Sequence, residues 1–198
     1  MEFKSQIKQD EWVCEMLNNK HNGYFIDIGA CDGVFFSNTW YLEKELDWTG
    51  ICLEPAITPF LKLIKERNCI CLNRAVYNKT GVVNFHEYEK DIWRGHIDTV
   101  GYKIDCISPI DLFKEFNVPK IIDYISIDVE GLEYEILTGF PFKEYKSRLW
   151  SIEHNSDEKN EKRDKVRRFM AEHGYIYVPL EKRTCGYFED WFYDEEQF

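Results

Sequence analysis

Acidic side chains bracket a glycine-bearing segment near the start of the chain, Asp27-Ile28-Gly29-Ala30-Cys31-Asp32-Gly33. A dinucleotide-binding turn reads G-x-G-x-x-G and offers bare backbone N–H groups to a pyrophosphate. Here Ala30 and Cys31 follow Gly29, and the flanking carboxylates of Asp27 and Asp32 would repel a phosphate. They favour a ligand that carries an ammonium and a sulfonium group, as S-adenosylmethionine does. The alternative is an ordinary strand-to-helix turn.

A further carboxylate, Glu54, ends the next apolar run, 51–54, and is followed by Pro55. In α/β folds an acid at about this distance downstream accepts hydrogen bonds from the ribose hydroxyls of a bound nucleoside. Both oxygens of a carboxylate can accept such bonds. A solvated strand end is the alternative, but the combination with the first turn predicts a cofactor site at one sheet edge.

Four more residues that could do chemistry follow two later apolar runs. Asp128 and Glu130 come after 121–127, and Glu153 and His154 end the run 149–153. A hydroxyl group is a poor nucleophile until a base or a divalent cation draws off its proton. We expect His154, Asp128 and Glu130 to be catalytic, because a histidine titrates near neutral pH.

Two alternatives to this catalytic role remain open. Asp128, Glu153 and His154 could instead hold a magnesium or manganese ion, since oxygen ligands with open water positions suit these ions. His154 could also be a histidine with satisfied hydrogen bonds at a strand end.

The elements that must position these residues can be predicted from hydrophobic periodicity. Apolar runs alternate with segments of helical period, which is typical of strands and crossover helices in a mostly parallel sheet. The predicted strands are 24–28, 51–54, 69–76, 121–127, 149–153 and 175–180, and the predicted helices are 38–46, 58–67, 109–116, 132–138 and 158–173. This pattern predicts an α/β, doubly wound sheet.

Other segments depart from the simple alternation. The runs 82–88 and 102–107 predict an added hairpin, and the aromatic tail 184–198 predicts an antiparallel last strand. We expect the loop 91–100 between the hairpin runs to be a substrate lid. Four aromatic side chains could stack on a sugar face, with ordinary packing as the alternative: Trp93, Tyr187, Trp191 and Phe192.

Several blocks of the chain resemble the FkbM-type methyltransferases of the S-adenosylmethionine-dependent class. The blocks are Ser5-Gln6-Ile7-Lys8-Gln9-Asp10, Gly23-Tyr24-Phe25-Ile26-Asp27-Ile28-Gly29-Ala30, Trp48-Thr49-Gly50-Ile51-Cys52-Leu53-Glu54-Pro55, Ile122-Asp123-Tyr124-Ile125-Ser126-Ile127-Asp128-Val129-Glu130-Gly131 and Ile152-Glu153-His154-Asn155. The D-V-E-G block after a strand is the most specific. The chain departs from the family pattern at Lys8, where glycine is common, and at Glu189, where a second aspartate is common.

The resemblance implies a Rossmann-like class I methyltransferase fold and roles for particular residues. Asp27, Gly29 and Asp32 would hold the methionine end of the cofactor and Glu54 its ribose, and the turn 73–75 would border the adenine. Gln9 and Asp10 would lie near the mouth of the site, although they could equally cap the first helix. The complete expected cofactor set is Gln9, Asp10, Asp27, Gly29, Ala30, Asp32, Asn38, Glu54, Pro55, Arg74, Ala75 and Asp128.

The resemblance also implies the acceptor class. It favours O-methylation of a sugar, glycan or similar polyol, with a polyketide-type natural product as the alternative. A binding or scaffold module that keeps the fold without turnover is a second alternative.

Composition limits the remaining possibilities. At 198 residues the chain fits one domain, with a helical lead-in at 1–22 and the core at 23–198. A net charge of −11 opposes binding to nucleic acid or to an anionic membrane surface. Seven cysteines without a zinc-type pattern predict reduced thiols, so we expect a soluble, cytoplasmic protein. The oligomeric state is left open.

Overall fold

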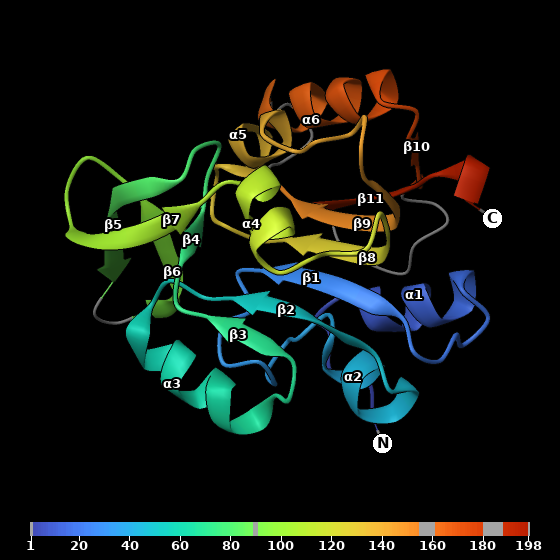
Figure 1. Ribbon diagram of the computed structural model, residues 1–198, viewed down its shortest axis with the longest axis horizontal. Coiled ribbons are helices and arrows are strands. Elements are labelled where there is room, and N and C mark those ends of the chain that lie inside the picture. The colour runs from blue at the N-terminus through green and yellow to red at the C-terminus, as the bar shows by residue number, and fades with distance from the viewer. Residues whose placement is uncertain (1, 89–90, 155–160, 180–187, 198) are drawn as a thin grey trace.

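The computed structural model describes residues 2–88, 91–154, 161–179 and 188–197, and its main feature is a seven-stranded sheet with the order β10-β11-β9-β8-β1-β2-β3 (Figure 1). The strands β9, β8, β1, β2 and β3 are parallel, and β11 runs antiparallel to both of its neighbours. The strands are β1 (Tyr24–Ile28), β2 (Thr49–Leu53), β3 (Ile70–Leu72), β8 (Ile121–Ile127), β9 (Lys146–Glu153), β10 (Ile176–Tyr177) and β11 (Glu189–Tyr193). This arrangement confirms the predicted doubly wound sheet with an antiparallel last strand.

Helices cover both faces of this sheet. One apolar cluster joins the sheet to three helices, α4 (Pro109–Glu115), α5 (Glu133–Thr138) and α6 (Glu161–Glu172). A second cluster joins the other face to α1 (Gln9–Met16), α2 (Trp40–Leu46) and α3 (Ile57–Glu66). The short 3-10 helix η2 (Glu195–Gln197) follows the last strand. The strands therefore bury both faces, which explains why β1 and β8 appear in the sequence as nearly continuous apolar runs.

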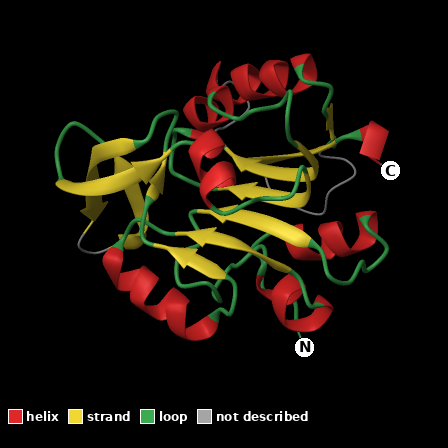
Figure 2. Cartoon of the chain, in the orientation of Figure 1, coloured by secondary structure: helices red, strands yellow, loops and turns green. Residues whose placement is uncertain are grey.

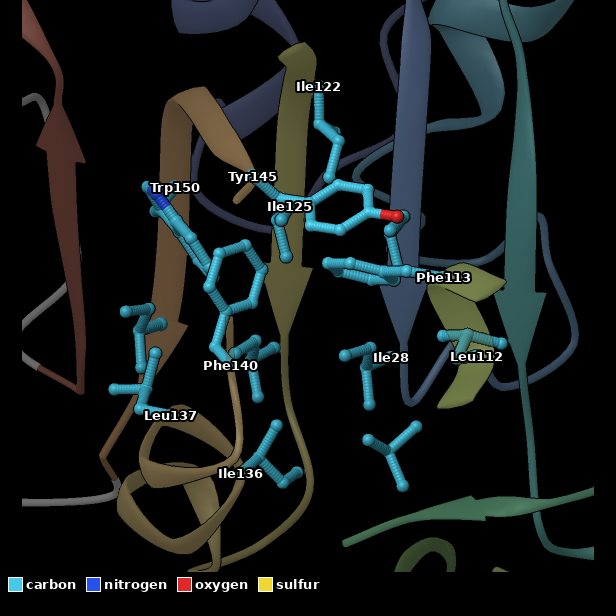
Figure 3. Packing of buried hydrophobic residues seen from close by; sticks show 14 of the residues in the cluster. Ile28, Leu112, Phe113, Ile122, Ile125, Ile136, Leu137, Phe140, Tyr145 and Trp150 are labelled. Atoms are coloured by element: carbon cyan, nitrogen blue, oxygen red, sulfur yellow. The ribbon is translucent and has the colours of Figure 1, made fainter. Parts of the chain in front are cut away.

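Aromatic rings fill much of the first cluster (Figure 3). The ring of Phe140 lies edge-on to Phe113 at 5.2 Å and to Trp150 at 4.8 Å between ring centroids. Such edge-to-face pairs add about 0.5–1.5 kcal/mol each beyond the area they bury. This packing fixes α4 and α5 against the sheet, and α5 begins immediately after the Asp128 segment.

A second sheet of four strands, in the order β4-β7-β5-β6, lies beyond the carboxyl ends of the parallel strands (Figure 2). Its strands are β4 (Ala75–Val76), β5 (Gly81–Tyr88), β6 (Asp91–Ile97) and β7 (Tyr102–Ile107). It contains the predicted hairpin runs, and β4 connects it to the main sheet. Its position makes it a wall over the sheet edge where the acidic residues were expected.

Three sequence-based expectations about these elements were wrong. The apolar run 69–76 is not one strand, because the chain leaves the main sheet after β3 and enters the small sheet at β4. The segment 91–100 is not a loop, since most of it is the strand β6, paired with β5. Trp191 and Phe192 do not form an open sugar platform, because they are 3% and 1% exposed within β11. The other two aromatic side chains, Trp93 and Tyr187, lie outside the described part.

None of the helices within the described ranges combines the length and the apolar character needed to cross a bilayer.

Candidate functional site

A cavity of about 420 Å³ opens at the carboxyl ends of β1, β2, β8 and β9, with β4, β5 and β6 of the small sheet contributing to its wall. Ligands of open α/β sheets bind at this edge, and the volume suits a small molecule. None of the described residues that line the cavity is a lysine or an arginine. Six of them carry a carboxyl group: Asp27, Glu54, Asp128, Glu130, Glu153 and Glu189.

The turn after β1 is tied to both neighbouring strands by backbone hydrogen bonds. The N–H groups of Gly29 and Ala30 donate to the carbonyl of Leu53, at 2.9 and 3.0 Å. The N–H of Asp128 donates to the carbonyl of Ile28 at 2.9 Å. Gly29 has a φ of +90°, and a Cβ atom there would overlap the carbonyl oxygen of Asp128. Glycine is therefore required by both conformation and space.

Gly29→Ala is expected to lower the free energy of unfolding by about 3 kcal/mol, since the added methyl group meets rigid backbone and the left-handed conformation is strained for alanine. Gly174→Ala is the matched control, because Gly174 has a similar φ of +87° with open space around it. That change should cost only about 1 kcal/mol. Chemical denaturation measures both values, and equal losses would contradict the close approach to Asp128.

Asp27 lines the cavity and is almost fully buried. Its Oδ2 accepts a hydrogen bond of 2.6 Å from the hydroxyl of Thr39, and the residue is 4% exposed. Burial raises the pKa of Asp27 to about 6, although the bond from Thr39 and the nearby charge of Arg67 oppose the rise. One oxygen of this carboxyl group thus remains for a ligand at the position expected for the methionine end.

Arg67, at the end of α3, organises the loop after β1 and was not predicted from the sequence. Its guanidinium donates to Glu43 at 2.6 Å, to the carbonyl of Gly33 at 3.2 Å and to the hydroxyl of Thr39 at 3.0 Å. It also lies over the ring of Phe25, 5.4 Å from the centroid. The sequence placed it in an ordinary helix end, and its burial depends on partners that local patterns do not reveal.

Glu54 joins the ends of β1 and β2 through its side chain. One oxygen accepts a hydrogen bond of 2.9 Å from the N–H of Cys31, and the other accepts one of 2.7 Å from the N–H of Ala56. Burial raises the pKa of Glu54 to about 7, against the lowering effect of these two bonds. Each oxygen keeps a second acceptor position, so the geometry fits a carboxylate that accepts from two hydroxyl groups.

Three carboxyl groups converge where β8 and β9 end. One oxygen from each of Asp128, Glu130 and Glu153 lies within 4.8 Å of the other two. Burial, the neighbouring Asp128 carboxylate and the hydrogen bond between them raise the pKa of Glu153. Asp128 is exposed to solvent at the cavity, but desolvation by the surrounding wall still raises its pKa, while the hydrogen bond from Glu153 opposes the rise. A protonated Glu153 that donates to an ionised Asp128 accounts for both directions.

Glu130 reaches this cluster through an unusual backbone. It has a φ of +59°, and Gly131 follows at +118°. The N–H of Gly131 donates to Glu133 at 2.8 Å, which closes the bend before α5. Non-glycine residues in the left-handed region are uncommon and are concentrated at functional sites.

His154 is absent from the described cavity wall. The residue is 2% exposed, and its Nε2 lies 3.5 Å from Oδ2 of Asp190 in β11. Arg167 of α6 donates to both oxygens of Asp190, at 2.6 and 2.8 Å. His154 therefore belongs to a buried polar group that joins β9, β11 and α6. Its catalytic role and its role as a metal ligand remain predictions that this position does not favour.

Asp190→Asn is expected to lower the free energy of unfolding by about 2 kcal/mol at neutral pH, because it leaves Arg167 and His154 without their anionic partner. Burial opposes ionisation of Asp190, but the bonds from Arg167 and His154 hold its pKa at about 2. Since an unfolded aspartate titrates near about 3.9, this stability is present above that pH and is lost as the pH falls toward about 2. The two proteins should therefore converge in denaturation experiments at low pH.

The exposed neighbour Asp164 provides the control for that measurement. Its carboxylate pairs with Arg163 at 2.9 Å but is 56% exposed. Asp164→Asn should change the stability by less than about 0.5 kcal/mol. An equally small effect of Asp190→Asn would show that the buried group contributes no stability.

The remaining predicted cofactor residues divide into two groups. Gln9, Ala30, Asn38, Pro55 and Ala75 line the cavity together with Gly29 and the acids described above. The second group consists of Asp10, Asp32 and Arg74, whose side chains bond to other residues of the chain.

Each of these three has a structural task in the described chain. Asp10 is fully buried and accepts from the N–H groups of Lys4 and Ser5, at 2.7 and 3.1 Å. Oδ1 of Asp32 accepts from the N–H groups of Val34 and Phe35. Arg74 pairs with Glu115 at 3.1 Å. Their proposed contact with the cofactor stays a prediction.

Several cavity residues were not predicted from the sequence as ligand-facing groups, among them Phe35, Phe36, His96 and Glu189. His96 lies on β6, opposite His86 in the register of the hairpin. Glu189 was noted only as a departure from the family pattern, yet it lines the cavity and accepts a hydrogen bond of 2.9 Å from Gln9. The two phenylalanines follow the β1 turn and gave no signal beyond their apolar character.

Comparison with known proteins assigns this architecture. A family model described as "Methyltransferase FkbM domain" matches residues 27–177. Among curated proteins no relative matches the chain.

Solved structures share the fold at low sequence identity. The chain is similar to methyltransferase FkbM from Methylobacillus flagellatus KT, with a TM-score of 0.53 and 13% identity over 88% of this chain and 44% of that one. It is also similar to the fibrillarin pre-rRNA processing protein of Methanococcus jannaschii, with a TM-score of 0.51 and 13% identity over 89% of this chain and 68% of that one. For a TehB-like SAM-dependent methyltransferase from Corynebacterium glutamicum ATCC 13032 Kitasato, the TM-score is 0.50 and the identity 7%, over 96% and 89% of the two chains. The fold is thus the Rossmann-like class I methyltransferase fold, and the chain spans under half the length of the FkbM structure.

Proposed function

Because this chain belongs to the FkbM family of S-adenosylmethionine-dependent methyltransferases, we propose that it transfers the methyl group of this cofactor to a hydroxyl oxygen of a sugar, glycan or similar polyol. The acidic cavity at the sheet edge is the observation that carries this proposal. It contains six carboxyl groups and no described lysine or arginine. A pyrophosphate would be repelled there, whereas a cation with hydroxyl and ammonium donors would be attracted.

The proposed cofactor position follows the strand ends. Glu54 would accept hydrogen bonds from the ribose hydroxyls, and Pro55 and Ala75 would border the adenine. Asp27 and Asn38 face the methionine end, where the ammonium group donates. In this position the cofactor would present its sulfonium methyl group to Asp128 and its neighbours at the ends of β8 and β9. The burial of Asp27 and Glu54 and their hydrogen bonds support this orientation.

The proposed reaction is a displacement in which the acceptor oxygen attacks the methyl carbon in line with the departing sulfur. When bound, the cofactor supplies a methyl group already activated by its sulfonium. Asp128 would accept the hydroxyl proton as the carbon–oxygen bond forms and the carbon–sulfur bond breaks. Glu153 donates a hydrogen bond to Asp128 and holds its orientation, and the cavity wall limits access of water to the reacting atoms.

A magnesium or manganese ion is a second route to the same deprotonation. The convergent oxygens of Asp128, Glu130 and Glu153 fit a divalent cation. In this ligand set Glu130 replaces His154, which the sequence had offered as the third ligand. Such an ion would acidify the acceptor hydroxyl. If the ion is required, methyl transfer will stop in a chelator and return with Mg²⁺ or Mn²⁺, whereas unchanged activity in the chelator supports the carboxylate as base.

Calorimetry with S-adenosylhomocysteine and with NAD tests the cofactor. We expect S-adenosylhomocysteine to bind and NAD not to bind, and the reverse result would contradict the proposal. A radiolabelled methyl donor with a panel of glycans and polyols then tests the transfer. Cofactor binding without transfer to any member would favour a binding module over an enzyme acting on these acceptors.

Nucleic acid is not expected as a partner, since the net charge of −11 opposes it.

A further inference from the structure

Two adjacent aromatic side chains are exposed at the cavity. Phe35 is 51% exposed and Phe36 is 47% exposed, and both line the cavity. Their ring centroids lie 3.9 Å apart. About half of the surface of each ring is exposed to solvent, so a ligand in the cavity would cover apolar surface that is otherwise in water.

The backbone holds this pair in place. Oδ1 of Asp32 accepts from the N–H groups of Val34 and Phe35, at 3.1 and 2.9 Å. Phe36 has a φ of +56° and forms a backbone bridge with Ser5 of the N-terminal segment. The left-handed conformation is strained for a bulky residue. Such a conformation persists only where the surroundings impose it, and it is concentrated at ligand-binding positions.

The polar groups of the same cavity define the charge of its ligands. The carboxyl groups described above supply acceptors and negative charge, without a described lysine or arginine in the wall. A second ligand beside the cofactor therefore has to bring hydrogen-bond donors and no negative charge.

We propose that Phe35 and Phe36 form an acceptor platform, on which the apolar face of an uncharged or positively charged sugar ring stacks while its hydroxyl or ammonium groups face the carboxylates. The C–H face of a sugar suits an aromatic ring, and an amino sugar adds a cation–π contact. Phosphorylated sugars and uronic acids are excluded by the acidic wall. This inference rests on the proposed methyl transfer and narrows its substrate class.

The charge selectivity can be measured by binding alone. The protein is saturated with S-adenosylhomocysteine and titrated with matched methyl glycosides of neutral, amino, uronic and phosphorylated hexoses, with saturation-transfer NMR as the readout. We expect the neutral and amino glycosides to bind at least tenfold more tightly than their anionic counterparts. Equal or tighter binding of the anionic glycosides, or no binding of any glycoside, would contradict the proposed platform. Loss of S-adenosylhomocysteine binding itself would instead count against the proposed function.

Two variants test the aromatic pair. Phe35→Ala and Phe36→Gly, the latter compatible with a positive φ, should each weaken binding of the neutral glycosides about tenfold, with S-adenosylhomocysteine affinity within twofold of the parent. Ile57→Ala is the control, because Ile57 is 48% exposed but does not line the cavity. If both variants lose the cofactor instead, the rings contact the adenosyl group. If neither changes glycoside binding, there is no platform.

Discussion

Replacement of Asp128 by asparagine is expected to lower the rate of methyl transfer by about 10²- to 10⁴-fold, the range associated with loss of a general base. The asparagine keeps the size of the side chain and its place beside Glu153 but cannot accept the hydroxyl proton. Binding of S-adenosylhomocysteine should persist, because the backbone contacts of residue 128 to Ile28 do not depend on the side chain. Single-turnover transfer from a labelled methyl donor and calorimetry measure the two quantities separately.

His154→Gln is the informative comparison for that variant. Since His154 faces Asp190 and is absent from the described cavity wall, its replacement should lower stability while the turnover of the folded protein stays within about tenfold. The opposite pattern, with a severe loss of turnover from His154→Gln and a mild one from Asp128→Asn, would restore the histidine as the base. Transfer that survives both changes would leave alignment in the cavity as the main source of rate enhancement.

Glu54→Gln is expected to weaken binding of S-adenosylhomocysteine about 100-fold. The change removes the negative charge and places an amide N–H₂ group opposite one of the two backbone N–H donors, Cys31 or Ala56. Hydrogen bonds to a charged group contribute about 1.5–3 kcal/mol each, which corresponds to this loss. Calorimetry gives the affinity, and circular dichroism must show that the variant is folded.

The same residue predicts how binding depends on pH. Because burial raises the pKa of Glu54 to about 7, the free protein loses the ionised form as the pH falls through that value. Affinity for S-adenosylhomocysteine should drop about 20-fold between pH 8 and pH 6 in the parent protein. In Glu54→Gln the drop should be only about twofold, the part left by Asp27, whose pKa burial raises to about 6. Affinity that is flat in the parent would show that the charge of Glu54 does not contribute to cofactor binding.

Much of the main sheet could be predicted from the sequence. The bounds of β1 and β8 agree with the apolar runs 24–28 and 121–127, because strands buried on both faces leave a continuous apolar signal. The run 69–76 was wrongly predicted to be one strand, because the apolar residues before and after residues 73–74 belong to different sheets. Local pattern carries no information about which sheet a strand joins.

The functional site could likewise be predicted only in part from the sequence. Asp27, Glu54 and Asp128 line one cavity because each follows or ends a parallel strand, which the sequence shows directly. Whether His154 faces the cavity depends on Asp190 and Arg167, whose approach is set by the position of β11 and α6. Phe35 and Phe36 could not be separated from core residues by type alone, because only their exposure distinguishes them.

The position of β11 between β9 and β10 has a consequence for synthesis of the protein in the cell. Until residues 189–193 emerge from the ribosome, the nascent chain presents β9 as an open sheet edge. Unpaired strands of this kind invite association with other chains. Ribosome-bound intermediates of this protein should therefore be substrates for chaperones that shield strand edges, and slow translation of residues 189–193 should increase aggregation.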